Sequence, residues 1–319
     1  MAVYTHVNKE ELILFLKGYQ VGELKSFEEI SEGVENTNYK LITEKGTYIL
    51  TLYEDRVKKE DIPFFLDFMF HLSSNKIDCP LPIKNKENKL ISELNSKPAS
   101  ILSFLNGTSS KKITVEQTFE VGSVLAKIHL TGKKINIKRK NPMSIDNFEE
   151  LIINSAETAN TISSDLNIDI SNEFNRIKKN WPKDLPSGII HADLFPDNVL
   201  FEKNNISGVI DFCFSCIDFF SYDLGICINA WCFTEEGFDL SLSENLLKGY
   251  QSIRKLEDSE IENLPILCSA SSLRFLLTRL NDWKREKKNA VVTPKNPEDF
   301  VKILKFNKTI SSASEYGLK

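Results

Sequence analysis

The sequence predicts an α+β fold of two lobes, in which a small antiparallel sheet precedes a larger, mostly helical region. Residues 39–53 hold two apolar stretches around a Glu44-Lys45-Gly46 turn, the pattern of a β-hairpin. Beyond Asn106-Gly107, a turn signal, apolar residues recur mainly at the spacing of helices. We therefore expect an amino-terminal lobe of residues 1–105 and a carboxy-terminal lobe of residues 106–319.

The remaining elements follow from local patterns. Residues 62–73 form an apolar helical segment with Pro63 near its start, where proline is tolerated. Residues 98–105 predict a buried strand that leads to the crossover between lobes. Further helices are expected around Val121 to Ile128 and over about 148–180, 241–254 and 257–283, with a short hairpin between 187 and 211 and a solvated, lysine-rich loop over 132–147.

Composition limits the possible partners. The chain has 319 residues and a formal net charge of −5, so no global basic field would hold nucleic acid or an anionic membrane. The early apolar run, residues 12–16, is short and follows two glutamates, unlike a signal peptide. No stretch approaches the roughly 20 apolar residues of a membrane-spanning helix. We therefore expect a cytoplasmic protein with a small-molecule partner.

The six cysteines are in apolar or aromatic surroundings. Cys213 and Cys216 form a lone C-x-x-C, which would suit a redox or metal site, but a second pair of ligands is missing. We interpret the cysteines as small buried hydrophobic residues.

The strongest chemical signal is residues 191–198 (HADLFPDN), followed by an apolar strand, a turn and Val209-Ile210-Asp211. Phosphoryl transfer needs a carboxylate that accepts the proton of the attacking hydroxyl, and further oxygen ligands for magnesium. Asp193 and Asn198, five residues apart on a tight loop, suit both needs, and the hairpin can return Asp211 to them. The alternative is that Asp193 and Asn198 only cap a turn; the spacing and the following hairpin favour catalysis.

This motif resembles the catalytic loop and metal-binding aspartate of protein kinases and of the aminoglycoside and choline kinase group. The resemblance implies a bilobal protein-kinase-like fold, with ATP and Mg²⁺ as cofactors. It implies that Asp193 orients or deprotonates the substrate hydroxyl and that Asn198 and Asp211 bind Mg²⁺, a hard cation with oxygen ligands. We expect His191 to brace the loop and Asp197 to be a surface turn residue.

The same resemblance places a phosphate-covering loop at Gly33, Asn36, Thr37 and Asn38, where an ordinary hairpin turn is the competing interpretation. It places the adenine beside the backbone of Ser103 to Leu105.

One position departs from protein kinases. Their third strand carries a lysine that holds the α- and β-phosphates, and the matching residue here is Thr51. Either Arg56, Lys58 or Lys59 substitutes for that lysine, or the nucleotide is bound differently.

Over nearly the whole chain, the sequence is similar to the homoserine kinases of the aminoglycoside phosphotransferase fold. The likeness rests on residues 32–39 (EGVENTNY), 49–54 (ILTLYE), 191–198, 229–233 (NAWCF) and 274–280 (RFLLTRL). Thr51 belongs to that family's pattern. The resemblance implies transfer of the γ-phosphate of ATP to the hydroxyl of L-homoserine, a step toward threonine.

A zwitterionic substrate needs a cation for its carboxylate and an acid or carbonyl oxygens for its ammonium group. Arg274 and Arg279 lie in an apolar run, where an unpaired charge would be costly, so either is a candidate clamp for the carboxylate. Structural ion pairs or helix exposure are the alternatives for both arginines. Asp223 and Trp231 are further candidates, with a loop brace or helix cap, and a core tryptophan, as the respective alternatives.

Two other functions compete with a homoserine kinase. One is a kinase for another small alcohol, such as choline, methylthioribose or an aminoglycoside. The other is a nucleotide-binding pseudokinase, which the intact Asp193, Asn198 and Asp211 disfavour and only Thr51 supports.

Overall fold

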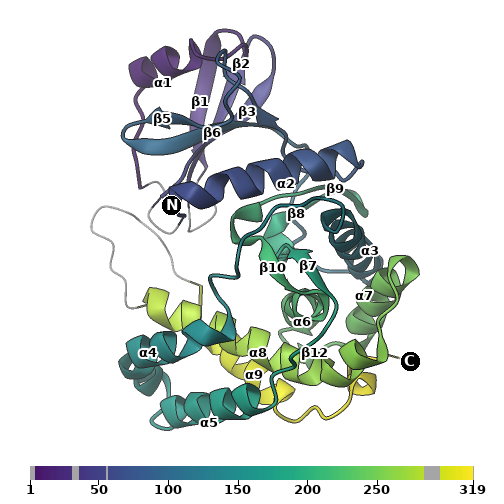
Figure 1. The fold of residues 1–319 in the computed structure, drawn as a ribbon. Helices are drawn as coiled ribbons and strands as arrows, with labels where there is room; N and C mark the ends of the chain where they lie inside the picture. Colours follow the sequence, from purple (N-terminus) through teal and green to yellow (C-terminus); the bar gives the residue numbers. More distant parts are fainter. Residues whose placement is uncertain (1–3, 31–35, 55–56, 284–294, 319) are drawn as a thin grey trace. The chain divides into compact units, whose positions relative to one another are not determined.

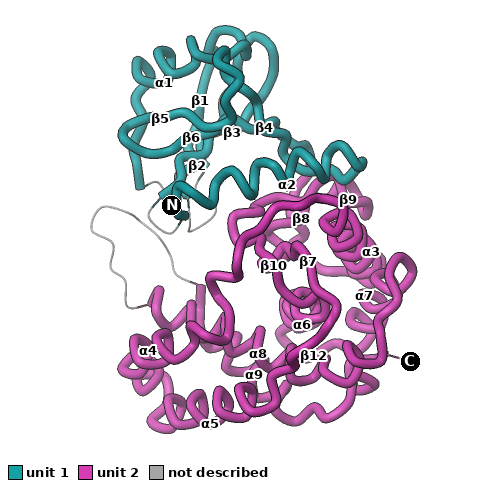
Figure 2. Tube along the Cα trace, in the orientation of Figure 1, with its two compact units in different colours: residues 1–106, 287–293 teal, residues 107–286, 294–319 magenta. Residues whose placement is uncertain are grey.

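The computed structural model describes residues 4–30, 36–54, 57–283 and 295–318 (Figure 1). They divide into two compact units, of which the first ends at Asn106 and the second begins at Gly107 (Figure 2). The sequence placed the lobe boundary one residue earlier. Gly33 and Arg56, to which the sequence analysis assigned possible roles, lie outside the described residues.

The first unit is built on a 6-stranded antiparallel sheet with the order β1-β2-β3-β6-β4, and β5 pairs with β6. The predicted hairpin is confirmed, because β2 and β3 pair antiparallel with Asn38 opposite Thr51. Its helices are α1 (Lys9–Leu16) and α2 (Ile62–Ser74). Its strands are β1 (Leu24–Ile30), β2 (Thr37–Thr43), β3 (Thr47–Leu52), β4 (Pro82–Ile83), β5 (Ser92–Leu94) and β6 (Lys97–Ser103).

The core of this unit forms where the sheet meets α1. Leu41 and Leu50 on the sheet and Leu12 on the helix are fully buried in one apolar cluster. Asn8 begins α1 with a capping box, since its side chain accepts from the Glu11 amide and the Glu11 carboxylate accepts from the Asn8 amide.

The second unit is mainly helical. Its helices are α3 (Val115–Gly132), α4 (Phe148–Ile162), α5 (Leu166–Lys179), α6 (Phe220–Trp231), α7 (Leu240–Ile253), α8 (Asp258–Trp283) and α9 (Glu298–Asn307). Three short strand pairs accompany them: β7 (Ser187–Ile190) with β10 (Cys216–Phe219), β8 (Val199–Glu202) with β9 (Asn205–Val209), and β11 (Phe233–Thr234) with β12 (Gly237–Phe238).

Close contact between α3 and α7 depends on two glycines. A Cβ atom at Gly122 would collide with the carbonyl of Leu246, and one at Gly249 would collide with the carbonyl of Phe119. The two helices therefore approach backbone to backbone, which brings side chains of α7 next to those of α3.

Three expectations for this unit need correction. The helical pattern over 148–180 is two helices, because the chain is extended at Ser163 within a polar stretch. Helix α6 was not expected, since it is buried on all sides and shows no amphipathic period. The 132–147 segment is not simply solvated: Arg139 donates to the carbonyls of Cys213 and Ser215 at 3.0 and 2.8 Å.

A search for membrane spans among the described residues finds no helix with the length and apolar character to cross a bilayer.

Candidate active site

The predicted catalytic loop is a tight turn at the end of β7. The amide of Phe195 donates to the carbonyl of Asp193 at 2.8 Å, and the amide of Asn198 donates to the carbonyl of Phe195 at 2.9 Å. The Asn198 side chain donates to the carbonyl and the carboxylate of Asp193 at 2.7 and 3.1 Å. Asp193 and Asn198 lie on one tight turn, as predicted, and their side chains are in direct contact.

Asp211 returns to this loop through the β8–β9 hairpin. Val199 pairs with Val209, and the Ile210 amide donates to the carbonyl of Asn198 at 3.0 Å. Asp211 has φ 61°, a left-handed conformation that is uncommon for residues other than glycine. Ala192, which precedes Asp193, has φ 65°. Such strained backbone conformations persist where the surrounding contacts enforce them, often at functional sites.

His191 joins the loop to the hairpin. It is fully buried, and its Nε2 lies 3.0 Å from the carbonyl of Ile210, while its Nδ1 lies 3.2 Å from the amide of Asp193. A carbonyl only accepts and an amide only donates, so the ring carries its proton on Nε2 and is neutral. Burial lowers the pKa of His191, which fits the neutral form. The ring thus braces the loop, as expected.

Asp223 on α6 binds the backbone of the catalytic loop. Its carboxylate accepts from the amides of His191 and Ala192 at 2.8 and 2.9 Å. It also lies 3.1 Å from Nε2 of His129, a residue of α3. All four groups are buried, so the carboxylate fixes the direction in which the chain enters the catalytic turn.

A chain of buried side chains extends from Asp223 to the residue after α7 and to the start of α8. The Tyr250 hydroxyl lies 2.8 Å from Nδ1 of His129, and Arg254 donates to the Tyr250 oxygen at 3.1 Å. Arg254 in turn forms a two-pronged ion pair with Glu260, at 3.1 and 2.8 Å. Arg254 only donates and Asp223 only accepts, so the bonds that join them through Tyr250 and His129 all run toward the Asp223 carboxylate. The bonds from Arg254 to Glu260 run the other way.

Arg274 and Trp231 also contact the loop from within the protein. Arg274 is 2% exposed and donates from Nη1 to the carbonyl of Ala192 at 2.6 Å. Trp231 is fully buried and donates from its indole nitrogen to the carbonyl of Leu194 at 2.7 Å. The substrate contacts expected of Arg274, Asp223 and Trp231 therefore gain no support from the structure, because all three side chains are buried and bind the loop backbone.

Arg279 has a different position. It donates to the carbonyl of Asn296 at 2.7 Å and to the carboxylate of Asp299 at 3.0 Å, so it anchors the segment that begins α9. That segment carries Lys295, whose ammonium group lies 2.6 Å from the carboxylate of Asp197. Asp197 is exposed on the turn, as predicted, but its partner gave no signal in the sequence.

The electrostatic setting of Asp193 favours a basic carboxylate. Burial raises its pKa well above the usual value, the positive charge of Arg274 opposes this, and the nearby carboxylate of Asp211 adds to it. A carboxylate with a raised pKa is a stronger proton acceptor, which suits a general base.

The buried His129 predicts a pH dependence of stability. Burial lowers its pKa in the folded protein, so below the unfolded value near 6.5 the unfolded chain binds a proton that the folded chain does not. Stability should then fall with decreasing pH by about 1.4 kcal/mol per pH unit until the folded pKa is reached.

To isolate this effect, urea unfolding of the wild type and of His129→Asn would be compared between pH 7.5 and 5.5. The raised pKa of Asp193 acts in the opposite direction, because there the folded state binds the proton, but it is common to both proteins and cancels. Equal pH slopes would show that His129 does not resist protonation.

In the first unit, Thr51 forms a pair with Asn38. The Thr51 hydroxyl donates to the side-chain oxygen of Asn38 at 2.8 Å across the β2–β3 hairpin. Since the oxygen of Asn38 is the acceptor, its amide group points to the other side. The threonine at the position of the kinase lysine thus orients one of the predicted phosphate ligands.

The neighbouring Thr37 has a structural role. It is fully buried; its hydroxyl donates to Glu54 at 2.8 Å and accepts from the amides of Tyr4 and Thr5. The same carboxylate pairs with Lys97 at 3.1 Å. Asn36, which is 6% exposed, accepts from the amide of Glu54. Of the three side chains Asn36, Thr37 and Asn38, that of Asn38 is therefore the best placed to contact a phosphate.

Comparison with known proteins decides the family. Residues 26–256 match the model of the phosphotransferase enzyme family. The homoserine kinase of Rhizobium meliloti (strain 1021) is 46% identical over 320 residues, covering 100% of this chain and 98% of the relative. That of Bradyrhizobium sp. (strain ORS 278) is 44% identical over 319 residues, covering 100% and 99%. This chain belongs to the homoserine kinase family.

Solved structures agree with the fold of this kinase. The amicoumacin kinase hAmiN, in complex with AMP-PNP, Ca²⁺ and Ami, superposes with a TM-score of 0.73 at 15% identity, covering 95% of this chain and 92% of that one. A choline kinase from Cryptosporidium parvum Iowa II gives 0.64 at 16% identity, covering 97% and 94%. The predicted α+β, bilobal protein-kinase-like fold is confirmed.

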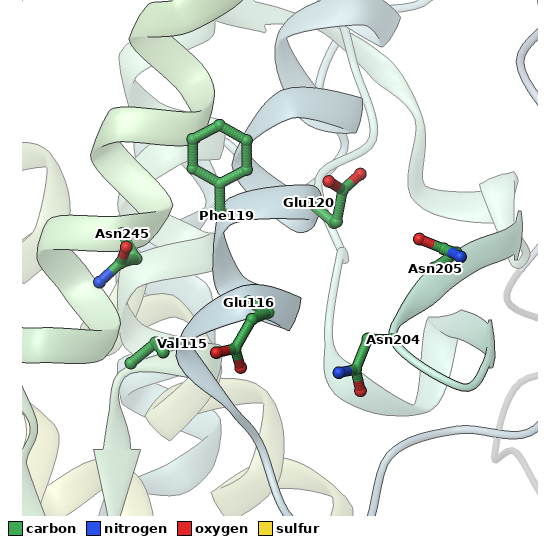
Figure 3. A pocket seen from close by; sticks show the side chains of 7 residues that line it. All are labelled: Val115, Glu116, Phe119, Glu120, Asn204, Asn205 and Asn245. Atoms are coloured by element: carbon green, nitrogen blue, oxygen red, sulfur yellow. The ribbon is translucent and has the colours of Figure 1, made fainter.

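Neither the cysteines nor the surface pocket of this kinase adds to the site. Neither Cys213 nor Cys216 forms a disulfide, and the described residues contain no group of three or more His, Cys, Asp and Glu side chains that could hold a metal ion. A depression of about 440 Å³ lies between α3, α7 and the β8–β9 turn, lined by Glu116, Phe119, Glu120, Asn204, Asn205 and Asn245 among others (Figure 3). It shares no residue with the catalytic loop.

Proposed function

We propose that this chain transfers the γ-phosphoryl group of ATP to the side-chain hydroxyl of L-homoserine, giving O-phospho-L-homoserine, a step toward threonine. The observation that carries this proposal is the contact between Asp193 and Asn198, with Asp211 returned to the same loop. Full-length relatives at 44–46% identity that are named homoserine kinases favour this substrate over the other small alcohols.

Asp193 acts on the substrate hydroxyl. Its carboxylate orients the hydroxyl and accepts the proton as the oxygen attacks the γ-phosphorus, and its raised pKa suits that task. Asn198, His191 and Asp223 keep the carboxylate in place, the first by a side-chain hydrogen bond and the others through the loop backbone. The residues thus supply positioning, which accounts for much of catalysis in phosphoryl transfer.

The residues beside Asp193 fit a magnesium ion. The amide nitrogen of Asn198 is used by Asp193, so its side-chain oxygen remains as the ligand atom, and Asp211 adds a carboxylate. An oxygen-only set suits Mg²⁺, which keeps its other positions for waters and phosphates. Bound there, Mg²⁺ would neutralise phosphate charge and offset the effect of Asp211 on the pKa of Asp193.

The first unit binds the nucleotide in this proposal. Asn38 contacts the phosphates through its amide group, with Asn36 and Thr37 shaping the strand behind it. The Ser103 amide donates to the carbonyl of Leu81 at 2.9 Å, and the Ser103 hydroxyl accepts from the amide of Leu81 at 2.8 Å. The backbone of Leu105 is therefore the better candidate to pair with adenine.

The variant Thr51→Val tests the role of Asn38. It keeps the shape of the side chain but removes the hydrogen bond that orients Asn38, which is expected to raise the KM for ATP about 3- to 10-fold. The KM for homoserine should be unchanged. Thr47→Val on the same strand is the matched control, and an unaltered KM for ATP in Thr51→Val would contradict the assignment.

A coupled assay of ADP release over a panel of alcohols tests the function itself. We expect turnover with L-homoserine to exceed that with choline, methylthioribose and an aminoglycoside. Turnover of choline without turnover of homoserine would exclude the proposal. ATP binding without turnover of any alcohol would instead favour the pseudokinase. The expected cytoplasmic location remains a prediction.

A further inference from the structure

The structure contains an exposed ion pair on the catalytic turn itself. Lys295 and Asp197 meet at 2.6 Å, and their side chains are 49% and 56% exposed. The Lys295 ammonium group also lies 5.4 Å from the centre of the Phe195 ring. Lysine and aspartate thus present opposite charges side by side, next to the residues that carry the predicted chemistry.

This pair lies within range of the catalytic carboxylate. Asp197 follows Asp193 by four residues, and the turn between them is closed by the hydrogen bonds of Phe195 and Asn198. The Lys295 ammonium group lies over the ring of Phe195, which follows Asp193 by two residues. A substrate whose hydroxyl lies at Asp193 can therefore extend its other end toward the pair.

Two other cations near the loop, both among the described residues, already have partners of their own. Arg274 is 2% exposed and bound to the Ala192 carbonyl, and Arg279 is bound to the Asn296 carbonyl and to Asp299. Arg279 thereby fixes the residue that follows Lys295, so it positions the lysine without facing the substrate. Its side chain is 13% exposed, against 49% for Lys295.

We propose that the Lys295–Asp197 pair is the receptor for the amino-acid head group of the substrate. The substrate carboxylate binds the Lys295 ammonium group, and the substrate ammonium group binds the Asp197 carboxylate. This inference rests on the proposed function and names the residues that select an α-amino acid over other alcohols.

The energetics favour such an exchange. An exposed ion pair contributes little net free energy, because water screens it and two flexible side chains must be ordered. Opening the pair therefore requires little free energy, and each charge then pairs with the opposite charge of the zwitterion. A buried pair such as Arg254–Glu260 would be far more costly to open.

Single-charge variants and truncated substrates test the proposal. The variants Lys295→Gln and Asp197→Asn would be assayed with L-homoserine, with 3-aminopropan-1-ol, which lacks the carboxylate, and with 4-hydroxybutyrate, which lacks the amine. Lys295→Gln should raise the KM for homoserine about 10- to 100-fold, as expected for a lost charge-assisted hydrogen bond, while activity with 3-aminopropan-1-ol stays the same.

Asp197→Asn should raise the KM for homoserine similarly and leave activity with 4-hydroxybutyrate unchanged. In both variants, kcat and the KM for ATP should stay within about twofold of the wild type. Lys295→Arg, which keeps the charge, should restore most of the affinity. Lys178→Gln breaks an exposed pair with Glu149 elsewhere in the same unit and is the matched control.

The outcomes separate the two proposals. An unchanged KM for homoserine in Lys295→Gln and Asp197→Asn would overturn the head-group receptor. So would an equal loss with homoserine and the truncated substrates, which would indicate general damage to the turn. A wild-type enzyme that does not turn over homoserine would instead refute the proposed function.

Discussion

The variant Asp193→Asn is expected to lose at least ~100-fold in kcat, the scale of lost acid–base assistance. The carboxamide has nearly the same shape and can still accept the hydrogen bond that Asn198 donates at 3.1 Å. It cannot accept the hydroxyl proton at neutral pH. The loss should therefore appear in kcat, while the KM for ATP stays within about threefold.

Two measurements make this result decisive. Circular dichroism and urea unfolding should show that Asp193→Asn folds as the wild type does. Asp184→Asn, which makes the same change at an exposed position of the same unit, should leave kcat unaltered. A near-normal kcat in Asp193→Asn would remove the carboxylate from its assigned role.

Asp223→Ala is expected to have the second large effect, on both stability and catalysis. The carboxylate is fully buried and accepts from the amides of His191 and Ala192 and from the ring of His129. Its removal leaves three buried donors without an acceptor, which should lower the free energy of unfolding by about 3–5 kcal/mol. The released loop should also lower kcat.

If Asp223→Ala does not fold, Asp223→Asn keeps the test open. The carboxamide retains one acceptor oxygen but directs an N–H group toward a donor, so we expect a smaller loss of stability with a clear fall in kcat. Urea unfolding measures the first effect and steady-state kinetics the second. Asp165→Ala, at an exposed helix start without a capping bond, should change stability by no more than ~0.5 kcal/mol. Wild-type stability in Asp223→Ala would show that the loop does not depend on this carboxylate.

Contacts within the site between residues that lie close together along the chain could be predicted from the sequence. The spacing of Asp193 and Asn198 placed them on one tight turn, although the contact between their side chains was not itself predicted. The pairing of Thr51 with Asn38 could also have been found, because counting outward from the turn at residues 44–46 sets the register of the hairpin. The sequence analysis named both residues but did not pair them.

Contacts between residues that are far apart in the sequence could not be predicted in this way. Lys295 and Asp197 are 98 residues apart, and His129 and Tyr250 are 121 apart. A lone lysine or histidine in the sequence gives no indication of its partner. The two arginines stood out only because they lie in an apolar run, and they were therefore chosen as candidates to bind the substrate carboxylate. Arg274 is buried because it binds a backbone carbonyl of the loop, a role that its sequence context does not distinguish from substrate binding.

Helix α6 illustrates the limit for secondary structure. Every residue from Phe220 to Asn229 is buried, so the hydrophobic pattern has no exposed face from which a period can be recognised. By contrast, α2 and α7 have polar faces and were predicted to within one residue at each end.

The identity of the phosphorylated product tests the central claim most directly. ³¹P nuclear magnetic resonance of a reaction containing the wild type, ATP, Mg²⁺ and L-homoserine should show a new phosphomonoester signal. That phosphorus should couple to the methylene protons beside the former hydroxyl, and its amount should equal the ADP formed. Phosphate released only as inorganic phosphate, or no homoserine-dependent signal at all, would contradict the account.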